Sequence, residues 1–417
     1  MPGLDKQLNL PNAQVPRHSC RRRPVLGVPP IVQYAQREGE IELAWGHPDP
    51  VMLPVADIKY ATARMLDRYG TSSLSYGHPP GPGPLAKFVC DRLAVVDGRP
   101  PKLDEVVISA GNSQAIDLVV SLFTSVGDVL LTESPTYHFA FRIFRDHGLE
   151  LEPVPVDEEG LRVDALAATL VRLRKAGRVA RLLYTVPTYH NPTGITFSDE
   201  RRRSLVELAA AERLTIIEDD PYRELAYDGP PSDSLWSIAP PGTVIRLGTF
   251  SKSLAPGLRV GFVTADAPTA ERIGLSGVLD SGGAISHFAA LVVAEYATSG
   301  AFEPNVERLR TALRERRTAM LEALDEHLAG FAGWRVPAGG YFLWLTLPNG
   351  MSAQRLLPIA ERHGTTYVPG SVFHVDPSRG DSALRLAFSR HSPDELREAV
   401  RRLGLAAREA SAGGRTI

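Results

Sequence analysis

Residues 248–263 read GTFSKSLAPGLRVGFV and place one lysine, Lys252, among small hydroxyl residues. The apolar run VIRL at residues 244–247 precedes this stretch, and a turn containing Pro256 and Gly257 follows the lysine. A lysine in such a turn is commonly an exposed loop residue. Its position at the end of an apparently buried strand allows a second interpretation, in which the amine faces a binding site. The sequence around it decides between the two.

Short apolar runs alternate with helical patterns between residues 104 and 265. Five runs are expected to be buried strands, at residues 106–109, 128–132, 181–186, 214–219 and 244–249. Segments 113–123, 138–148 and 199–213 repeat apolar residues every three or four positions, which is typical of amphipathic helices. This alternation predicts an α/β fold, with a largely parallel sheet between helices.

The C-terminal third has a different pattern. Residues 300–330 predict one long amphipathic helix, and three strands are expected at 334–348, 365–370 and 383–388. A closing helix over 392–409 begins with Ser392 and Glu395 at capping-box spacing. We therefore expect an N-terminal arm (1–45), a large domain (46–290) and a small α+β domain (291–417), with the arm packing near the small domain.

Composition excludes several classes of function. The formal net charge of −2 gives no attraction to nucleic acid or to an anionic membrane, and the basic cluster at 17–23 is expected to be a solvated arm. Cys20 and Cys90 lie far apart, which argues against a disulfide framework or a metal site. No apolar run approaches the ~18 residues of a membrane helix, and the N-terminus lacks the apolar core of a signal peptide. We expect a cytoplasmic protein without metal, membrane or nucleic acid.

Polar side chains follow each expected strand, and the carboxyl ends of parallel strands meet at one edge of a sheet. The candidates are Asn112 and Ser113 after the first strand, Tyr137 after the second, Asn191 after the third, Asp219 and Tyr222 after the fourth, and Thr249, Ser251, Lys252 and Arg259 after the fifth. Each has an ordinary explanation alone: a helix cap, a packed ring, a turn or an ion pair. Their convergence on one edge favours a shared site.

This set of side chains meets the needs of pyridoxal 5′-phosphate. The cofactor aldehyde requires a lysine, its pyridine nitrogen requires a carboxylate, and its ring oxygen requires hydrogen-bond donors. Its phosphate suits a helix N-terminus and a cation. The sequence therefore predicts that Lys252 forms an imine with this cofactor.

Four segments resemble the fold-type I aminotransferases: TFSKSLAPGLRVG, NPTG, EDDPY and PAGGYFLW. The chain is most similar to the class I/II branch that includes α-aminoadipate and kynurenine aminotransferases, from about residue 40 to about residue 405. The resemblance implies the fold-type I architecture, with a large domain built on a mostly parallel, seven-stranded sheet and a smaller α+β C-terminal domain.

The resemblance also implies roles for the cofactor-binding residues. Lys252 would carry the imine and move the proton, Asp219 would pair with the pyridine nitrogen, and Tyr222 would act with them by bonding the ring oxygen. Asn191 would share that bond and Tyr137 would stack on the ring. The phosphate would be held by Asn112, Ser113, Thr249, Ser251 and Arg259. Tyr76 would reach the phosphate of a neighbouring subunit, which implies a homodimer with shared active sites.

The same resemblance points to substrate contacts. Arg385 would bind the substrate α-carboxylate with its planar fork. The family segment AGGLP reads AWGHP at residues 44–48, so Gly46 is kept while Trp45 and His47 depart. Trp45 and His47 either line the substrate pocket, with Gly46 and Asn191, or pack against the arm. Tyr189 and His190 precede Asn191 where the family usually has a polar residue.

Two kinds of reaction remain open. The first expectation is transamination between an L-amino acid and a 2-oxo acid, as part of amino acid metabolism or biosynthesis. The alternative is an enzyme of specialised biosynthesis that uses the same cofactor for β- or γ-elimination or replacement, C–C bond formation or oxidation. A cofactor-binding transcriptional regulator is not expected, because only about 45 residues precede the fold and no winged-helix module is apparent.

Overall fold

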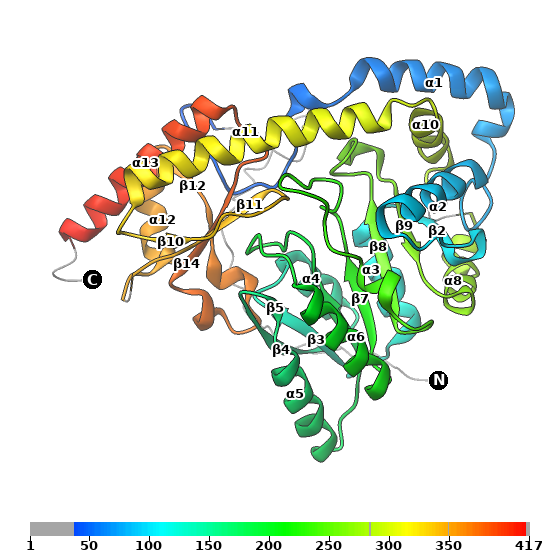
Figure 1. The fold of residues 1–417 in the computed structure, drawn as a ribbon, viewed down its shortest axis with the longest axis horizontal. Helices are drawn as coiled ribbons and strands as arrows, with labels where there is room; N and C mark the ends of the chain where they lie inside the picture. The colour runs from blue at the N-terminus through cyan, green and yellow to red at the C-terminus, as the bar shows by residue number, and fades with distance from the viewer. Residues whose placement is uncertain (1–36, 283–284, 349, 414–417) are drawn as a thin grey trace, which may run out of the picture. The chain divides into compact units, whose positions relative to one another are not determined.

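The structure is a computed structural model that describes residues 37–282, 285–348 and 350–413. The basic cluster at 17–23 and Cys20 lie outside these residues. Figure 1 shows the described elements.

The largest sheet has eight strands in the order β2-β9-β8-β7-β6-β3-β4-β5. Their bounds are β2 (Val106–Ser109), β3 (Val129–Ser134), β4 (Glu150–Asp157), β5 (Gly160–Leu161), β6 (Ala180–Thr185), β7 (Thr215–Asp219), β8 (Val244–Thr249) and β9 (Gly261–Thr264). Pairing is parallel from β8 through β4, whereas β9 runs antiparallel to both of its neighbours. The mostly parallel α/β sheet is confirmed. It has eight strands rather than seven because the chain turns back at Gly160 and adds the two-residue strand β5 to the edge strand β4.

The five strands expected from apolar runs are confirmed, with bounds within two residues. The patterns do not predict β4 and β9. Strand β4 contains Pro153 and Pro155, which cannot donate to a ladder and are tolerated because β4 lies near the edge of the sheet. Strand β9 has four residues, too few for a clear alternation.

Helices cover both faces of this sheet. They are α3 (Asn112–Phe123), α4 (His138–Asp146), α5 (Val163–Lys175), α6 (Asp199–Glu212), α7 (Leu235–Ile238), α8 (Ala267–Gly274) and α9 (Gly277–Asp280). Ile217 packs in a core with residues of α3 and α4, whereas its neighbour Ile216 packs with residues of α5 and α6. Successive side chains of a strand point to opposite faces, so the sheet is buried on both sides.

A third core joins α1 (Val55–Tyr69), α2 (Gly83–Asp97) and α10 (His287–Thr298). Phe302 and Val306, at the start of the long helix α11 (Phe302–Leu328), belong to this core. Met320 and Leu324, later in α11, pack in the C-terminal core instead. Helix α11 therefore bridges the two parts of the fold (Figure 1).

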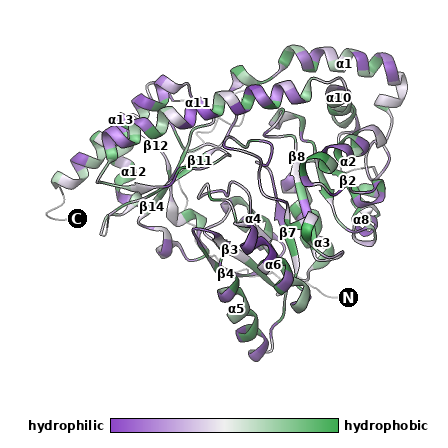
Figure 2. Ribbon diagram, in the orientation of Figure 1, coloured by the Kyte–Doolittle hydropathy of each residue, from purple (hydrophilic) through white to green (hydrophobic). Residues whose placement is uncertain are grey.

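The C-terminal part is an antiparallel sheet in the order β10-β11-β14-β13, packed with helices. Its elements are β10 (Gly333–Trp334), β11 (Phe342–Thr346), α12 (Ala353–Arg362), β13 (Val368–Pro369), β14 (Ala383–Ala387) and α13 (Pro393–Gly413). A separate parallel pair joins β1 (Ile41–Glu42) to β12 (Thr365–Thr366). Helices α11 and α13 alternate hydrophilic and hydrophobic bands in Figure 2, as expected for helices with one buried face.

Two details of this part test the sequence patterns. The capping box is confirmed, since the Ser392 N–H donates to the Glu395 carboxylate at 2.9 Å and the Glu395 N–H donates to the Ser392 hydroxyl at 3.3 Å. The strand expected over 334–348 is divided into β10 and β11, because Gly340 has φ 76° and turns the chain between them. The remaining elements are short 3₁₀ helices at Pro50–Met52, Gly70–Leu74, Leu103–Glu105, Pro256–Leu258, Gly370–Phe373 and Pro377–Gly380.

Across the described ranges, no helix is both long enough and apolar enough to span a bilayer.

Candidate active site

Lys252 lies in the turn after β8 and points into the fold. Its amine donates to the Gly46 carbonyl at 2.9 Å and lies 5.4 Å from the centroid of the Tyr341 ring. Burial, assisted by the positive charges of Arg385 and Arg259, lowers the pKa of Lys252 to about 8. An exposed loop lysine would have neither contact. The amine is therefore a candidate base or nucleophile near neutral pH.

Asp219 ends β7 and is held by two donors. The Tyr184 hydroxyl donates to one carboxylate oxygen at 2.6 Å, and the Asn112 side-chain amide donates to the other at 2.5 Å. Burial raises the pKa of Asp219 to about 6, although both hydrogen bonds oppose the shift. A cation placed beside this carboxylate would favour its ionised form.

The side-chain amide of Asn112 is bonded within the fold. Besides Asp219 it donates to the Leu247 carbonyl at 3.3 Å, so the side chain supports Asp219. Its backbone N–H remains at the start of α3. Tyr184 was not a candidate, although a tyrosine inside the buried run RLLYT requires a hydrogen-bond partner and was therefore a usable signal.

The N-terminus of α3 meets Arg259, Ser251 and Thr249. Arg259 donates to the Ala110 carbonyl at 3.0 Å and lies 3.4 Å from the Ser251 hydroxyl, which in turn lies 3.0 Å from the Thr249 hydroxyl. Gly111 caps α3 with φ 87°, and a Cβ there would lie 2.6 Å from the Arg259 guanidinium. The free N–H groups of the helix and a guanidinium thus face one space, which suits a phosphate. Ser113 lies exposed in the first turn of this helix.

Arg385, on β14, is only 4% exposed. It donates to the Asn191 side-chain oxygen at 2.8 Å and to the Ala44 carbonyl at 2.5 Å. Its guanidinium carbon lies 4.1 Å from the centroid of the Phe342 ring and 4.9 Å from that of Phe373. Among the residues that the structure describes, no carboxylate lies within ion-pair distance of it, and burial lowers the pKa of Arg385 to about 10.

Two phenols act electrostatically on this arginine. Tyr222 is buried, with its ring centroid 5.5 Å from that of Tyr341 and 5.8 Å from that of Phe342. Tyr137 is half-buried at the start of α4, where burial raises its pKa to about 12. Both phenols raise the pKa of Arg385 against the larger effect of burial, so both lie near the guanidinium.

Segment 44–48 lines the same space. A Cβ on Gly46 would lie 2.4 Å from the Phe342 ring, so only glycine fits there. The rings of Trp45 and His47 lie 5.2 Å apart at 36°. Burial and the charges of Lys252 and Arg390 lower the pKa of His47 to about 4, so its imidazole is neutral. The charge of Lys252 therefore reaches His47, while residues 1–36 of the arm in the other alternative lie outside the described ranges.

Tyr76 lies apart from these residues. It is 89% exposed, and a Cβ on Gly282 would lie 2.8 Å from its ring. The sequence patterns also leave out Phe342, Phe373 and Tyr341 as individual site residues, although PAGGYFLW contains two of them.

The charge of the site fits the predicted cofactor. Lys252 is influenced by two other cations, Arg259 and Arg385, and by one carboxylate, Asp219. This positive excess complements a phosphate, which carries close to two negative charges at neutral pH, together with a substrate carboxylate. Over the described part of the chain, no group of three His, Cys, Asp or Glu side chains could hold a metal ion.

Comparisons with known proteins show which family the chain resembles. A family model described as aminotransferase class I and II matches residues 54–403. The chain is 36% identical over 383 residues to the 2-aminoadipate transaminase of Thermus thermophilus, covering 90% of this chain and 92% of that protein. It is 33% identical over 376 residues to the aromatic-amino-acid aminotransferase 1 of Thermococcus litoralis, covering 89% of each. The solved structure of the Pyrococcus horikoshii kynurenine aminotransferase is similar with a TM-score of 0.84 and 34% identity, covering 89% of this chain and 91% of that one.

Proposed function

The chain belongs to the class I and II aminotransferases, and on that premise we propose that Lys252 is its cofactor-binding lysine, assisted by Asp219 and Tyr222. The protein is a pyridoxal 5′-phosphate-dependent aminotransferase that moves an amino group between an amino acid and a 2-oxo acid. When bound, the cofactor supplies a ring that withdraws electrons from the substrate Cα. The residues of the chain bind and orient the cofactor and the substrate, and they move the proton.

The proton-transferring group is the amine of Lys252. With its pKa at about 8, a substantial fraction of the amine is neutral near pH 8 and can accept a proton from Cα. Asp219, held in place by Tyr184 and Asn112, would pair with the pyridine nitrogen of the bound cofactor. Tyr222 and Asn191 would hydrogen-bond the ring oxygen, and Tyr137 would stack on the ring.

The phosphate would be held at the start of α3. The backbone N–H groups of Asn112 and Ser113 would bind it from the helix, and Thr249, Ser251 and Arg259 would complete the site. Support comes from the contacts that join Arg259, Ser251 and Thr249 at this helix end.

The observation that carries this function is the environment of Arg385. A buried guanidinium between two phenyl rings, without a carboxylate partner among the described residues, is costly unless a ligand neutralises it. The α-carboxylate of the substrate is that ligand, and Asn191 orients the arginine for it at 2.8 Å. The positive charge of Arg385 lowers the pKa of the Lys252 amine, so the two groups lie close together. This closeness is required if Arg385 binds the α-carboxylate and Lys252 acts on the adjacent Cα.

The amino donors are 2-aminoadipate or an aromatic amino acid, as the names of the two relatives suggest. The neutral His47 and the Trp45 ring form the wall that selects among them, and Gly46 between them allows the Phe342 ring to pack against the backbone. The residue division into an arm, a large domain and a small domain, and the cytoplasmic location, remain predictions from the sequence.

The test is a single half-reaction. The cofactor-loaded enzyme is incubated with L-2-aminoadipate, L-tyrosine or L-kynurenine without any 2-oxo acid. We expect one equivalent of pyridoxamine phosphate and one of the matching 2-oxo acid, with Lys252→Ala as the inactive control. Continued product release with donor alone would indicate elimination or oxidation, and no reaction with any donor would reject this function.

The active unit is a homodimer in which Tyr76 reaches the phosphate of the partner subunit. Its 89% exposure, and the exposure of Tyr60 and Leu74 nearby in the chain, support this arrangement. Mixing Lys252→Ala and Tyr76→Ala subunits tests it. Each mixed dimer then has one intact site, so activity should return on mixing. No return of activity in confirmed mixed dimers would refute shared sites.

A further inference from the structure

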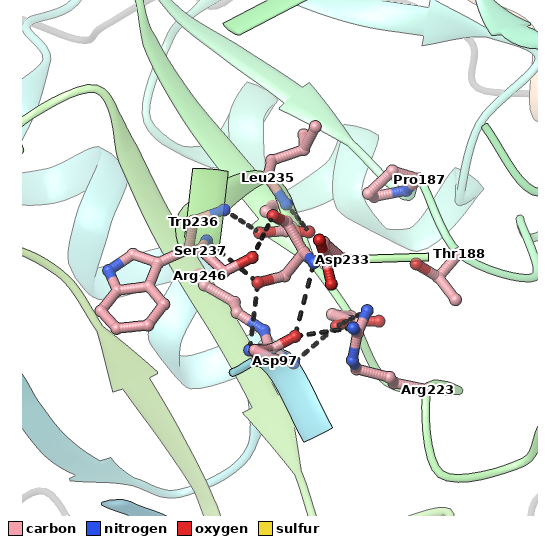
Figure 3. Close-up of polar contacts among 12 residues, drawn as sticks. Asp97, Pro187, Thr188, Arg223, Asp233, Leu235, Trp236, Ser237 and Arg246 are labelled. Carbon is pink, nitrogen blue, oxygen red and sulfur yellow. Dashed lines mark hydrogen bonds and ion pairs between the residues drawn. The ribbon is translucent and has the colours of Figure 1, made fainter. Parts of the chain in front are cut away.

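A group of buried charges lies beside the candidate active site and is not part of it. We call it the buried ion cluster: Asp97, Asp220, Arg223 and Arg246, whose residues are between 2% and 8% exposed. Arg246 donates to Asp220 at 2.8 Å and also to Asp97, while Arg223 lies 2.6 Å from the other oxygen of Asp97. Figure 3 shows Arg223 and Arg246 converging on Asp97.

The cluster and the active site share one short segment, residues 219–223. Asp219 and Tyr222 have their contacts on the cofactor side, with Tyr184 and Asn112 for the first and with Tyr341 and Phe342 for the second. Asp220 and Arg223 have theirs in the cluster. Asp220 and Arg223 therefore fix the segment to the buried ion cluster, whereas Asp219 and Tyr222 lie on the side of the proposed cofactor site.

The cluster also connects this segment to the strand that leads to Lys252. Arg246 lies on β8, where it pairs in register with Glu218 of β7. The Asp220 N–H donates to the Leu247 carbonyl at 3.0 Å, so side chain and backbone both join the ends of β7 and β8. Asp97, at the end of α2, anchors the assembly to a third element.

Two further charged residues beside the cluster, Glu218 and Arg202, keep the number of positive and negative charges equal. Glu218 accepts from the backbone N–H groups of Leu235 and Trp236 at 2.8 and 2.9 Å. Arg202 donates to Pro187 and Thr188 at 2.8 and 2.9 Å. Three arginines thus accompany three carboxylates. Although burial opposes the shift, Arg246 and Arg223 lower the pKa of Asp97 below its usual value.

Stability alone does not explain such a network, because well-packed apolar residues often replace buried ion pairs without loss. We propose that the buried ion cluster is a positioning element of the cofactor site. Asp97 and Arg246 hold residues 219–223 in the conformation in which Asp219 and Tyr222 meet the cofactor, without touching it themselves. This role rests on the proposed placement of the cofactor at Asp219 and Lys252.

The test compares Asp97→Asn with a matched control, Glu295→Gln. Glu295, on α10, is a buried carboxylate, 3% exposed, that pairs with Arg64 at 2.7 Å and Arg68 at 3.4 Å, both on α1, and has no ion pair with segment 219–223. Both substitutions remove a buried negative charge at nearly constant size. For each protein we would measure the melting temperature, the dissociation constant of pyridoxal phosphate and the visible circular dichroism of the bound cofactor.

We expect both variants to have a lower melting temperature than wild type. Only Asp97→Asn should bind the cofactor about tenfold more weakly and change its circular dichroism. Loss of a residue that supports a ligand has a comparable effect on affinity at metal sites. Equal cofactor affinity and dichroism in Asp97→Asn and wild type would overturn the positioning role. If Asp97→Asn does not fold, Arg246→Lys decides by the same readouts, because it keeps the charge but cannot span both carboxylates. A wild type that binds no cofactor through Lys252 would reject the proposed function instead.

Discussion

Two buried arginines in this protein have opposite surroundings. Arg246 contacts the carboxylates of Asp97 and Asp220, which raise its pKa in spite of burial. Arg385 contacts an amide oxygen, a carbonyl oxygen and two phenyl rings, and burial lowers its pKa to about 10. The first arginine is neutralised by the fold, whereas the second depends on a ligand.

The difference separates the structural use of charge from its functional use. A buried charge without a partner costs folding free energy, so it persists where a ligand supplies the opposite charge. Among the charges that act on Lys252 in the candidate active site, the two cations Arg259 and Arg385 outnumber the one carboxylate, Asp219. The buried ion cluster has no such excess. Imbalance of charge therefore marks the site that binds anions.

The largest effect is expected from Lys252→Ala, which removes the reacting amine from the unbalanced site. Turnover should fall by a factor on the order of 10²–10⁴, the contribution of general acid–base catalysis, and the visible absorbance of the lysine–cofactor imine should disappear. Steady-state rates and absorbance spectra measure both. Retention of the wild-type visible absorbance would mean that another amine binds the cofactor.

A smaller loss is expected when Arg385 is replaced by methionine. Its carboxylate contact is worth about 2–5 kcal/mol, so kcat/KM for amino acids should fall by a factor of roughly 30 to 4,000. The matched control is a primary amine that lacks the α-carboxylate, for which wild type and variant should react at similar rates. An equal loss with this amine would show that Arg385 does not act through the carboxylate.

Asp219 gives a pH signature in the apoprotein. Its pKa is raised from 3.8 to about 6, so ionising it opposes folding. The free-energy penalty of burying the ionised carboxylate is absent below about pH 4 and complete above about pH 6. Relative to Asp219→Asn, the wild-type free energy of unfolding should therefore fall by an amount on the order of 3 kcal/mol as pH rises through this window. Denaturant titrations at several pH values measure it, and a pH-independent difference would contradict it.

The smallest expected effect concerns the protonation of Lys252. Because only the neutral amine attacks an aldehyde, capture of the cofactor by the apoprotein should speed up as pH rises, with a midpoint at about 8. Arg385→Met removes a nearby cation and should move this midpoint upward by less than about one pH unit, since burial is the larger cause. Stopped-flow absorbance measures the midpoint. A downward shift would contradict the assigned neighbours.

Much of the fold follows from local patterns. The strand leading to Lys252 and the strand ending at Asp219 are continuous apolar runs, and a parallel sheet places their ends together. Strand β4 is not predicted because it contains Pro153 and Pro155, which a strand tolerates only near the edge of a sheet. The position of a strand within the sheet is a tertiary property that local sequence does not encode.

The sequence predicts the site residues that directly follow strands. It does not predict the contacts between residues that lie far apart in the chain. Arg385 was found through family resemblance, since its strand ALRLA has no local sign of function. The Asn112 amide turns to Asp219 because the two meet across the sheet edge, which no local spacing encodes. Asp97 lies at the end of a distant helix, so its link to residues 219–223 appears only in three dimensions.

The most direct test is the stability of two apoprotein variants, Arg385→Met and Arg246→Met, measured by denaturant unfolding without cofactor or substrate. Among the described residues, removing Arg246 leaves Asp97 with Arg223 alone and leaves Asp220 with no cation closer than the 3.9 Å of Arg223, and it should cost about 3–5 kcal/mol. Removing Arg385 relieves a buried, unpaired charge and should cost at most about 1 kcal/mol, for the hydrogen bonds lost at Asn191 and Ala44. Equal losses in the two variants would show that Arg385 is a structural residue like Arg246 and would contradict its assignment to the substrate carboxylate.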